Sequence, residues 1–97
     1  MTTAIARVEL SLEGCQSLKD KRQVLRSLID RARTRFQVSI AEVEDQDLWN
    51  HAVVGLAYVA GSGGHAREVI DKAVQWLSTA SAEAEMIDAQ IELVEPV

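Results

Sequence analysis

The chain has 97 residues, 47% of them hydrophobic, with a formal net charge of −5 at pH 7 and a single cysteine. A chain of this length folds around one core, so we expect residues 1–97 to form a single domain. One cysteine excludes an internal disulfide and a thiolate metal cluster. The sequence has neither a secretory leader pattern nor a run of about eighteen apolar residues, so we expect a soluble cytoplasmic protein without membrane association.

The first two elements are a strand and a basic helix. Residues 4–12 alternate apolar and polar side chains, which predicts a half-buried strand. Residues 17–35 carry apolar side chains at steps of three and four, which predicts an amphipathic helix. Ser17 is its expected N-cap, and Asp20 is placed to complete the cap.

This helix concentrates the positive charge of the chain. Residues 17–35 contain seven of the ten Lys and Arg residues and two of the fifteen acidic residues, a local charge of +5 that leaves −10 for the rest. Such cations lay their stems over the rim of a sheet in many proteins, but clustered arginines also suit phosphate recognition. We therefore expect a polyanion contact, RNA above all, at Lys19, Lys21, Arg22, Arg26 and Arg33.

The remaining elements alternate strands with one further helix. Residues 36–45 predict a strand with Phe36, Val38 and Ile40 inward, and Glu42 breaks the alternation, which suggests either a bulge or a strand that leaves the core. We expect a turn at 45–50, a central strand at 51–60, a break at 61–64, a helix at 65–80 and a last strand at 84–95. The order β-α-β-β-α-β predicts an α+β, ferredoxin-like fold, a split βαβ arrangement with a four-stranded antiparallel sheet and two helices on one face.

Two blocks of the sequence resemble the YlxP-like family of small bacterial proteins. They are SLKDKR at 17–22 and AEVEDQDLW at 41–49, within a similarity that covers nearly the whole chain. The resemblance implies a ferredoxin-like fold and an unassigned biochemical function. Members of the family are often encoded beside translation and ribosome-maturation factors, which implies an association with RNA or the ribosome. Cys15 lies outside the family pattern.

Two motifs suggest an enzyme, and both are incomplete. Gly61, Gly63 and Ala66 match G-x-G-x-x-A after a strand and before a helix, but the split topology lacks the neighbouring parallel strand of a dinucleotide fold. A glycine turn that holds at most an isolated anion is the better interpretation. Acylphosphatases have the same expected fold, yet the first loop here, EGCQSLKDKR, has one glycine and no phosphate cradle. We expect no catalytic residue, cofactor or small-molecule substrate.

An acidic group around residues 42–47 is the remaining candidate for a metal. Alternation would place Glu42 and Glu44 on one face of the strand and Asp45 on the other, and the calcium-loop spacing is absent. We expect a solvated acidic turn, which could pair with the basic helix of the same or another subunit, and no metal site. Cys15 precedes the positive end of the helix, which would lower its thiol pKa, but no base accompanies it.

The open face of the sheet is the last candidate surface. It should carry Ile5 and Val43, with Trp49 nearby, and a second copy of the chain often covers such a face. Only Tyr58 in the central strand would be available to stack bases, so base recognition on the sheet is disfavoured. The sequence thus predicts a non-enzymatic module that contacts RNA or a ribosomal particle through its first helix. The alternative is a protein-interaction or self-assembly module, a homodimer through Ile5, Val43 and Trp49, whose helix meets an acidic partner.

Overall fold

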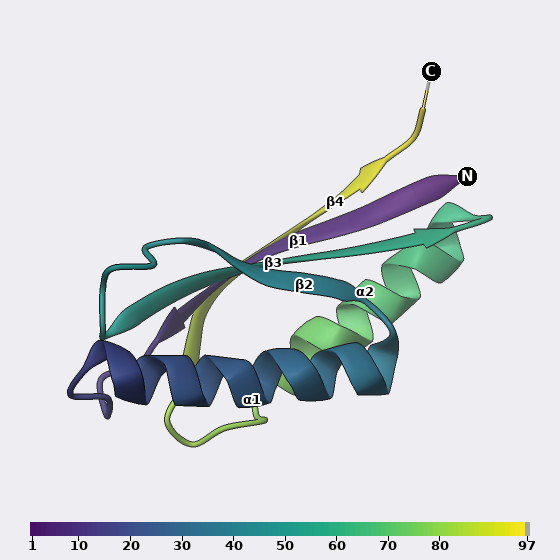
Figure 1. Ribbon diagram of the computed structural model, residues 1–97. Helices are drawn as coiled ribbons and strands as arrows, with labels where there is room; N and C mark the ends of the chain where they lie inside the picture. Colours follow the sequence, from purple (N-terminus) through teal and green to yellow (C-terminus); the bar gives the residue numbers. More distant parts are fainter. Residues whose placement is uncertain (97) are drawn as a thin grey trace.

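The computed structural model describes residues 1–96. Its elements are β1 (Thr2–Ser11), α1 (Leu18–Phe36), β2 (Ser39–Glu44), β3 (His51–Ala60), α2 (Gly63–Leu77) and β4 (Glu85–Val94). The strands form one antiparallel sheet in the order β2-β3-β1-β4, and both helices lie on one face of it (Figure 1). This confirms the α+β, ferredoxin-like prediction. None of the described helices is long and apolar enough to cross a membrane.

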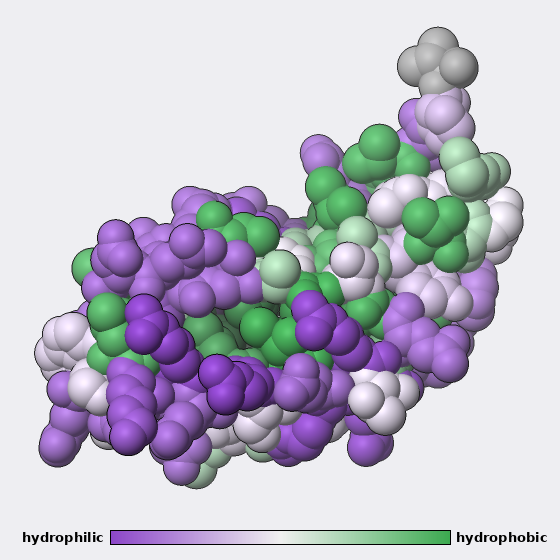
Figure 2. Space-filling view, viewed as in Figure 1, coloured by the Kyte–Doolittle hydropathy of each residue, from purple (hydrophilic) through white to green (hydrophobic). Residues whose placement is uncertain are grey.

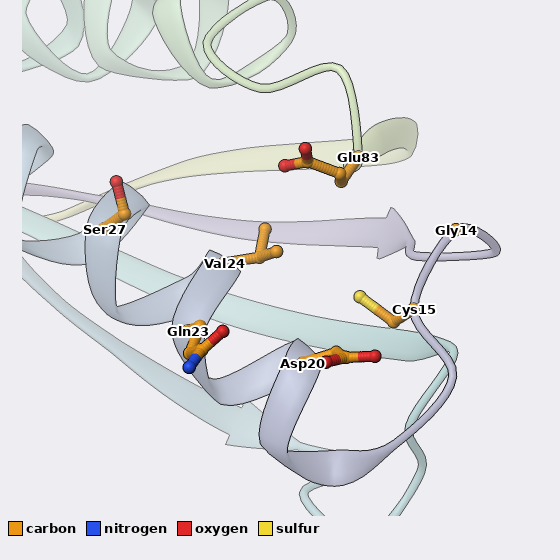
Figure 3. Close-up of a pocket in the computed structure, with 7 residues that line it drawn as sticks. All are labelled: Gly14, Cys15, Asp20, Gln23, Val24, Ser27 and Glu83. Carbon is orange, nitrogen blue, oxygen red and sulfur yellow. The ribbon is translucent and has the colours of Figure 1, made fainter.

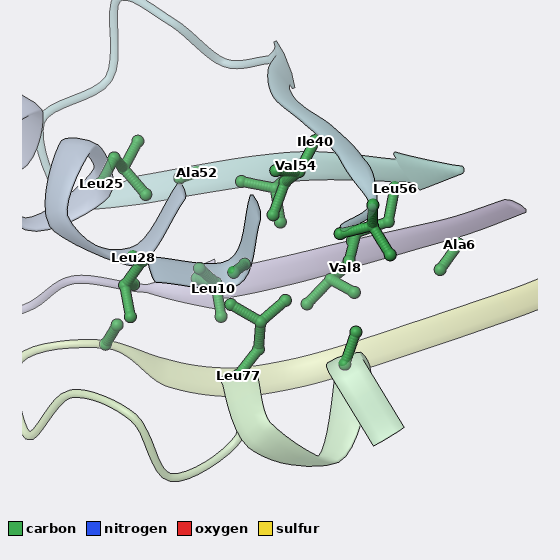
Figure 4. Close-up of a cluster of buried hydrophobic side chains, with 14 of the residues drawn as sticks. Ala6, Val8, Leu10, Leu25, Leu28, Ile40, Ala52, Val54, Leu56 and Leu77 are labelled. Atoms are coloured by element: carbon green, nitrogen blue, oxygen red, sulfur yellow. The ribbon is translucent and has the colours of Figure 1, made fainter. Parts of the chain in front are cut away.

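The core lies between the sheet and the two helices. Val8 in β1 pairs with Val54 in β3 and with Ala89 in β4, so β1 and β3 occupy the middle of the sheet. Their inward side chains pack against aliphatic residues of α1 and α2 (Figure 4). Neither of the helices in residues 1–96 covers the opposite face of the sheet, so that face is open to solvent.

The caps of α1 explain where the helix begins and ends. The backbone N–H of Asp20 donates to Ser17 Oγ at 3.1 Å, and the N–H of Gln16 donates to Asp20 Oδ2 at 3.1 Å. This confirms Ser17 as the N-cap. At the other end Gln37 has φ of 56°, in the left-handed region that terminates helices. Phe36 therefore belongs to α1, and its predicted place in the second strand is wrong.

A bulge in β2 changes which way its acidic residues point. Glu42 pairs with Val54, whereas Glu44 pairs with the adjacent Val53, so Val43 is the extra residue. The bulge was predicted, but its consequence was not. Because one inserted residue reverses the alternation, Glu42 faces α1 and Glu44 faces the open side. The prediction that both carboxylates share one face is wrong.

A second irregularity lies in β4. The register with β1 shifts between Glu9 and Leu10, which leaves Ile87 as the extra residue, and Ile87 is 52% exposed. The predicted bounds of this strand, 84–95, are within one residue of the observed Glu85–Val94, but the predicted alternation was unbroken. Strict alternation fails wherever a bulge inserts one residue.

Candidate nucleic-acid interface

The ten Lys and Arg side chains fall into two groups in the folded protein. Seven have a carboxylate, carbonyl or aromatic partner: Arg7, Lys21, Arg31, Arg33, Arg35, Arg67 and Lys72. Among residues 1–96, the other three have no such partner, and all three are exposed: Lys19, Arg22 and Arg26. They lie within two turns of α1, on the flank that the helical spacing predicts. We call these three residues the basic flank.

Lys21 is the exception within the predicted RNA-binding set. Its side chain is 1% exposed, and its ammonium group donates to the carbonyls of Asp45 at 2.7 Å and Leu48 at 2.5 Å. Glu42 Oε2 lies 2.8 Å from the same nitrogen. A phosphate could reach this ammonium only by displacing the loop, so the assignment of Lys21 to the RNA surface is wrong.

The Lys21 contacts join the two sequence blocks that resemble the YlxP-like family. Lys21 belongs to SLKDKR, and Glu42, Asp45 and Leu48 belong to AEVEDQDLW. The burial of Lys21 could have been predicted from the sequence, because Lys21 has helical spacing with the buried residues Leu25, Leu28 and Ala32. A lysine on the apolar stripe of a helix needs an internal partner.

The basic flank borders the side of α1 that faces β2. Arg33 marks this side, since its Nη2 donates to the carbonyl of Ile40 in β2 at 2.9 Å. The Arg33 side chain remains 55% exposed and also lies near Asp30, at 3.8 Å. Figure 2 shows strongly hydrophilic side chains along α1 and a hollow with a hydrophobic floor above them. Arg33 is thus partly engaged, whereas Lys19, Arg22 and Arg26 are free.

The opposite side of α1 packs toward α2. The guanidinium of Arg31 lies 5.2 Å from the ring centre of Trp76, and that of Arg35 lies 5.8 Å from Phe36. Phe36 and Trp76 also meet edge to face at 5.9 Å between ring centres. Cations over aromatic faces are already stabilised within the protein. Arg31 therefore contributes to packing between the helices, whereas Arg35 packs on an aromatic ring of its own helix.

The open face of the sheet carries a network of paired charges. Arg7 donates to Glu9 Oε1 at 2.8 Å and to Glu44 Oε2 at 2.7 Å. His51 lies between Asp45 Oδ2 at 2.7 Å and Glu9 Oε2 at 3.3 Å. The hydrogen bonds from Arg7 hold the pKa values of Glu9 and Glu44 below their usual range. Arg7 is the only Lys or Arg in the four strands, so this face is acidic.

Of the aromatic and apolar residues expected near the open face, some lie on it and others do not. Tyr58 pairs with the buried Ala4 and meets His65 of α2, with ring centres 5.8 Å apart, so it faces the helices. Ile5 and Val43 lie on the open face, 37% and 51% exposed. Trp49, 44% exposed, lies in the loop between β2 and β3. Base stacking on the sheet therefore has no aromatic platform among the described residues.

The pocket at the start of α1 contains the single cysteine of the chain. It has a volume of about 400 Å³ and is lined by Cys15 together with Asp20 and Glu83 (Figure 3). Cys15 is 3% exposed, and burial, then the nearby carboxyl groups, raises the pKa of its thiol. The predicted lowering by the helix end is wrong, because loss of solvent outweighs it.

The other two chemical candidates have local structural roles. Ser62 caps α2, accepting from the N–H of His65 at 3.3 Å, so Gly63 and Gly64 belong to the first turn of that helix, and the predicted break through residue 64 is wrong. Within the described part of the chain, no three His, Cys, Asp or Glu residues are grouped so that they could hold a metal ion. The acidic turn is instead partly neutralised by Lys21 and Arg7.

The fold and the site together define a ferredoxin-like α+β domain with three free cations on one flank of its first helix. Residues 3–91 match the family model "Protein of unknown function (DUF503)", and the chain belongs to this family. Over 57 residues it is 39% identical to the "Uncharacterized protein YlxP" of Bacillus subtilis (strain 168), a match that spans 59% of this chain and 62% of that protein. The resemblance to the YlxP-like family is thereby confirmed.

Two solved structures show lower similarity. The REP-associated tyrosine transposase bound to a REP hairpin is 16% identical, with a TM-score of 0.47 over 98% of this chain and 57% of that one. Rv0793 from Mycobacterium tuberculosis is 14% identical, with a TM-score of 0.36 over 97% of this chain and 95% of that one. At these scores neither similarity carries an argument about function.

Proposed function

We propose that this chain is a non-enzymatic cytoplasmic module that binds RNA, free or in a ribosomal particle, through the phosphate contacts of its basic flank. The observation that carries the proposal is the contrast in partners: Lys19, Arg22 and Arg26 are exposed and unpaired among residues 1–96, whereas the other seven cations are engaged. Arg22 and Arg26 are four residues apart, so they repel each other by a few tenths of a kcal/mol. A polyanion relieves this repulsion.

The mechanism is neutralisation of phosphates with release of their counterions. Each phosphate contact contributes about −0.7 to −0.9 to the slope of log K against log salt concentration. Four to five contacts, the number expected from sequence, correspond to a slope of roughly −3 to −4.5. With Lys21 buried and Arg33 partly engaged, three contacts remain, so the slope should be about −2 to −3.

The double variant Arg22→Glu with Arg26→Glu tests the proposal. Its affinity for a fluorescein-labelled RNA at about 50 mM salt should fall by roughly tenfold or more, because two attractive contacts become repulsive. The matched control is Arg67→Glu with Lys72→Glu on α2, which changes the net charge equally and breaks only exposed ion pairs. An equal loss in both double variants would show a net-charge effect and contradict a site on α1.

A sucrose gradient of cell lysate distinguishes free RNA from a ribosomal particle. We expect the protein to sediment with ribosomal subunits or their precursors at low salt and to leave them at moderate salt, as a contact through few phosphates requires. A protein that stays at the top of the gradient under both conditions would contradict ribosome association.

A second candidate function, self-assembly, has support of its own on the open face. Ile5 and Val43 are exposed apolar side chains on a sheet face with no helix over it. Gly55 leaves room for Val43, whose Cγ1 lies 3.1 Å from where a Cβ at residue 55 would be. If two copies cover this face, Ile5→Ser with Val43→Ser should shift sedimentation equilibrium toward the monomer. A wild type that sediments at 10.7 kDa excludes the dimer.

A further inference from the structure

Trp49 differs from the other three aromatic residues in its surroundings. Phe36 and Trp76 pack against each other, and Tyr58 packs against His65. Trp49 is 44% exposed and has no aromatic or cationic partner among residues 1–96. A large aromatic side chain left exposed in this way commonly marks a contact surface.

The backbone around Trp49 is fixed, although the loop has no regular secondary structure. The carbonyl before it, that of Leu48, accepts from Lys21 Nζ at 2.5 Å, and the carbonyl after it, that of Asn50, accepts from the N–H of Leu12 at 2.9 Å. The N–H of Leu48 also donates to the carbonyl of Asp45 at 3.0 Å. The indole ring therefore extends from an anchored backbone, which lowers the entropy cost of placing a ligand on it.

The same hydrogen bonds place the backbone next to Trp49 near the first turns of α1, which carry the basic flank. Lys21 lies in α1 between Lys19 and Arg22, and its side chain reaches Leu48, the neighbour of Trp49. Figure 1 shows the loop between β2 and β3 meeting the sheet at the start of α1. An exposed aromatic ring and the exposed cations of the first turns of α1 thus lie at one end of the molecule.

Two of the four acidic residues at 42–47 have a Lys or Arg partner. Glu42 is paired with Lys21, Glu44 with Arg7, and Asp45 lies against His51. The carboxylates of Asp45 and Asp47 have no Lys or Arg partner in the described chain. The acidic composition of residues 42–47 therefore presents less repulsion to a phosphate than its sequence implies.

We propose that this end of the molecule binds unpaired nucleotides: one base stacks on Trp49 while the adjoining phosphates contact Lys19, Arg22 and Arg26. This inference rests on the proposed function and names its substrate class as single-stranded RNA. An exposed indole accepts any base by stacking, but the bases of a duplex are already stacked on each other. The three cations bind the phosphates of single-stranded and duplex RNA alike, so the preference for single strands comes from Trp49.

The test compares two labelled RNAs with similar numbers of phosphates, an oligouridylate of about twenty nucleotides and a G·C-rich duplex of about ten base pairs. Trp49→Ala should weaken binding of the oligouridylate about tenfold or more and leave duplex binding within about twofold. Trp49→Phe should retain most of the affinity because it keeps a stacking ring. Leu48→Ala, at an exposed apolar neighbour, is the matched control and should change neither affinity.

Fluorescence gives a second readout that does not depend on affinity. In a Trp76→Phe background Trp49 is the only tryptophan, and stacking on uracil should quench its emission. Duplex RNA should leave the emission unchanged. Should Trp76→Phe impair folding, the difference in quenching between wild type and Trp49→Phe provides the same information.

The outcomes separate this inference from the proposed function. If neither RNA binds at low salt, the proposed function fails and the inference fails with it. If both RNAs bind equally and Trp49→Ala changes neither, RNA binding stands and the inference is overturned. If Trp49→Ala instead converts a dimer to a monomer and free Trp49 is shielded from acrylamide, the ring belongs to a protein interface, which also overturns it.

Discussion

The basic flank of α1 and the open face of the sheet handle positive charge in opposite ways. On the open face, Arg7 is held by Glu9 and Glu44 at 2.8 and 2.7 Å, from its own strand and from β2. On α1, Lys19, Arg22 and Arg26 have no carboxylate within reach in the described chain. The difference teaches that a count of charges does not locate a binding surface. The cations without internal partners locate it.

Lys21 is a cation of α1 that is paired inside the protein, and its substitution should have the largest effect on stability. Lys21→Ala removes the partner of Glu42 and of two loop carbonyls, so we expect the free energy of unfolding to fall by roughly 3 kcal/mol, as when a buried ion pair loses one member. Urea unfolding measures the loss. Lys72→Ala is the control, because its pair with Glu68 is exposed and should contribute less than about 1 kcal/mol. Equal losses in the two variants would mean that Lys21 is not a structural anchor.

The salt dependence of RNA binding sharpens the comparison next. Removing one free cation, as in Arg22→Ala, should reduce the magnitude of the slope of log K against log salt by about 1. Arg7→Ala removes a cation that is already paired and should leave the slope unchanged. Anisotropy titrations at several salt concentrations measure both slopes. A similar decrease for Arg7→Ala would place the RNA contact on the sheet and break the distinction between the two regions.

The smallest expected effect is a pH dependence on the open face. The pKa values of Glu9 and Glu44 are lowered in the folded protein from their usual 4.5 by hydrogen bonds from Arg7. These groups therefore stabilise the fold above the unfolded pKa, and this stabilisation is lost as the pH falls through the folded values. Urea midpoints between about pH 6 and 3 should fall less steeply for Arg7→Met than for wild type. If the urea midpoints of the wild type and Arg7→Met changed with pH in parallel, the ion pairs of Arg7 with Glu9 and Glu44 would not stabilise the fold.

Periodic patterns and capping residues were sufficient to predict the elements and the fold. The alternation of Val8 and Leu10 gave β1 its buried face, and the steps between Leu25, Leu28 and Ala32 gave α1 its packing stripe. Errors occurred at single residues, at Phe36 and at the two bulges. A bulge depends on the facing strand, so a pattern within one strand suggests it without fixing its consequences.

The candidate site was predicted in part. The sequence located the basic helix and its cationic flank, because helical spacing fixes which side chains share a side. It assigned Lys21 to the RNA surface and Trp49 to a dimer interface. The Lys21 assignment is contradicted by burial, and the dimer assignment of Trp49 stays a prediction. Two of the three partners of the Lys21 ammonium are not visible in the sequence as side chains, since they are backbone carbonyls 24 and 27 residues away; the third is the carboxylate of Glu42.

By itself, the sequence determined the order of the elements, the ferredoxin-like topology and the concentration of positive charge on α1, because these follow from local periodicity and composition. Only the tertiary structure decided which of those charges are free. A cation is neutralised by groups that the fold brings to it, as Glu42 is brought to Lys21 and Glu44 to Arg7. Such encounters depend on strand register and on one inserted residue at Val43, which no pattern within a single element specifies.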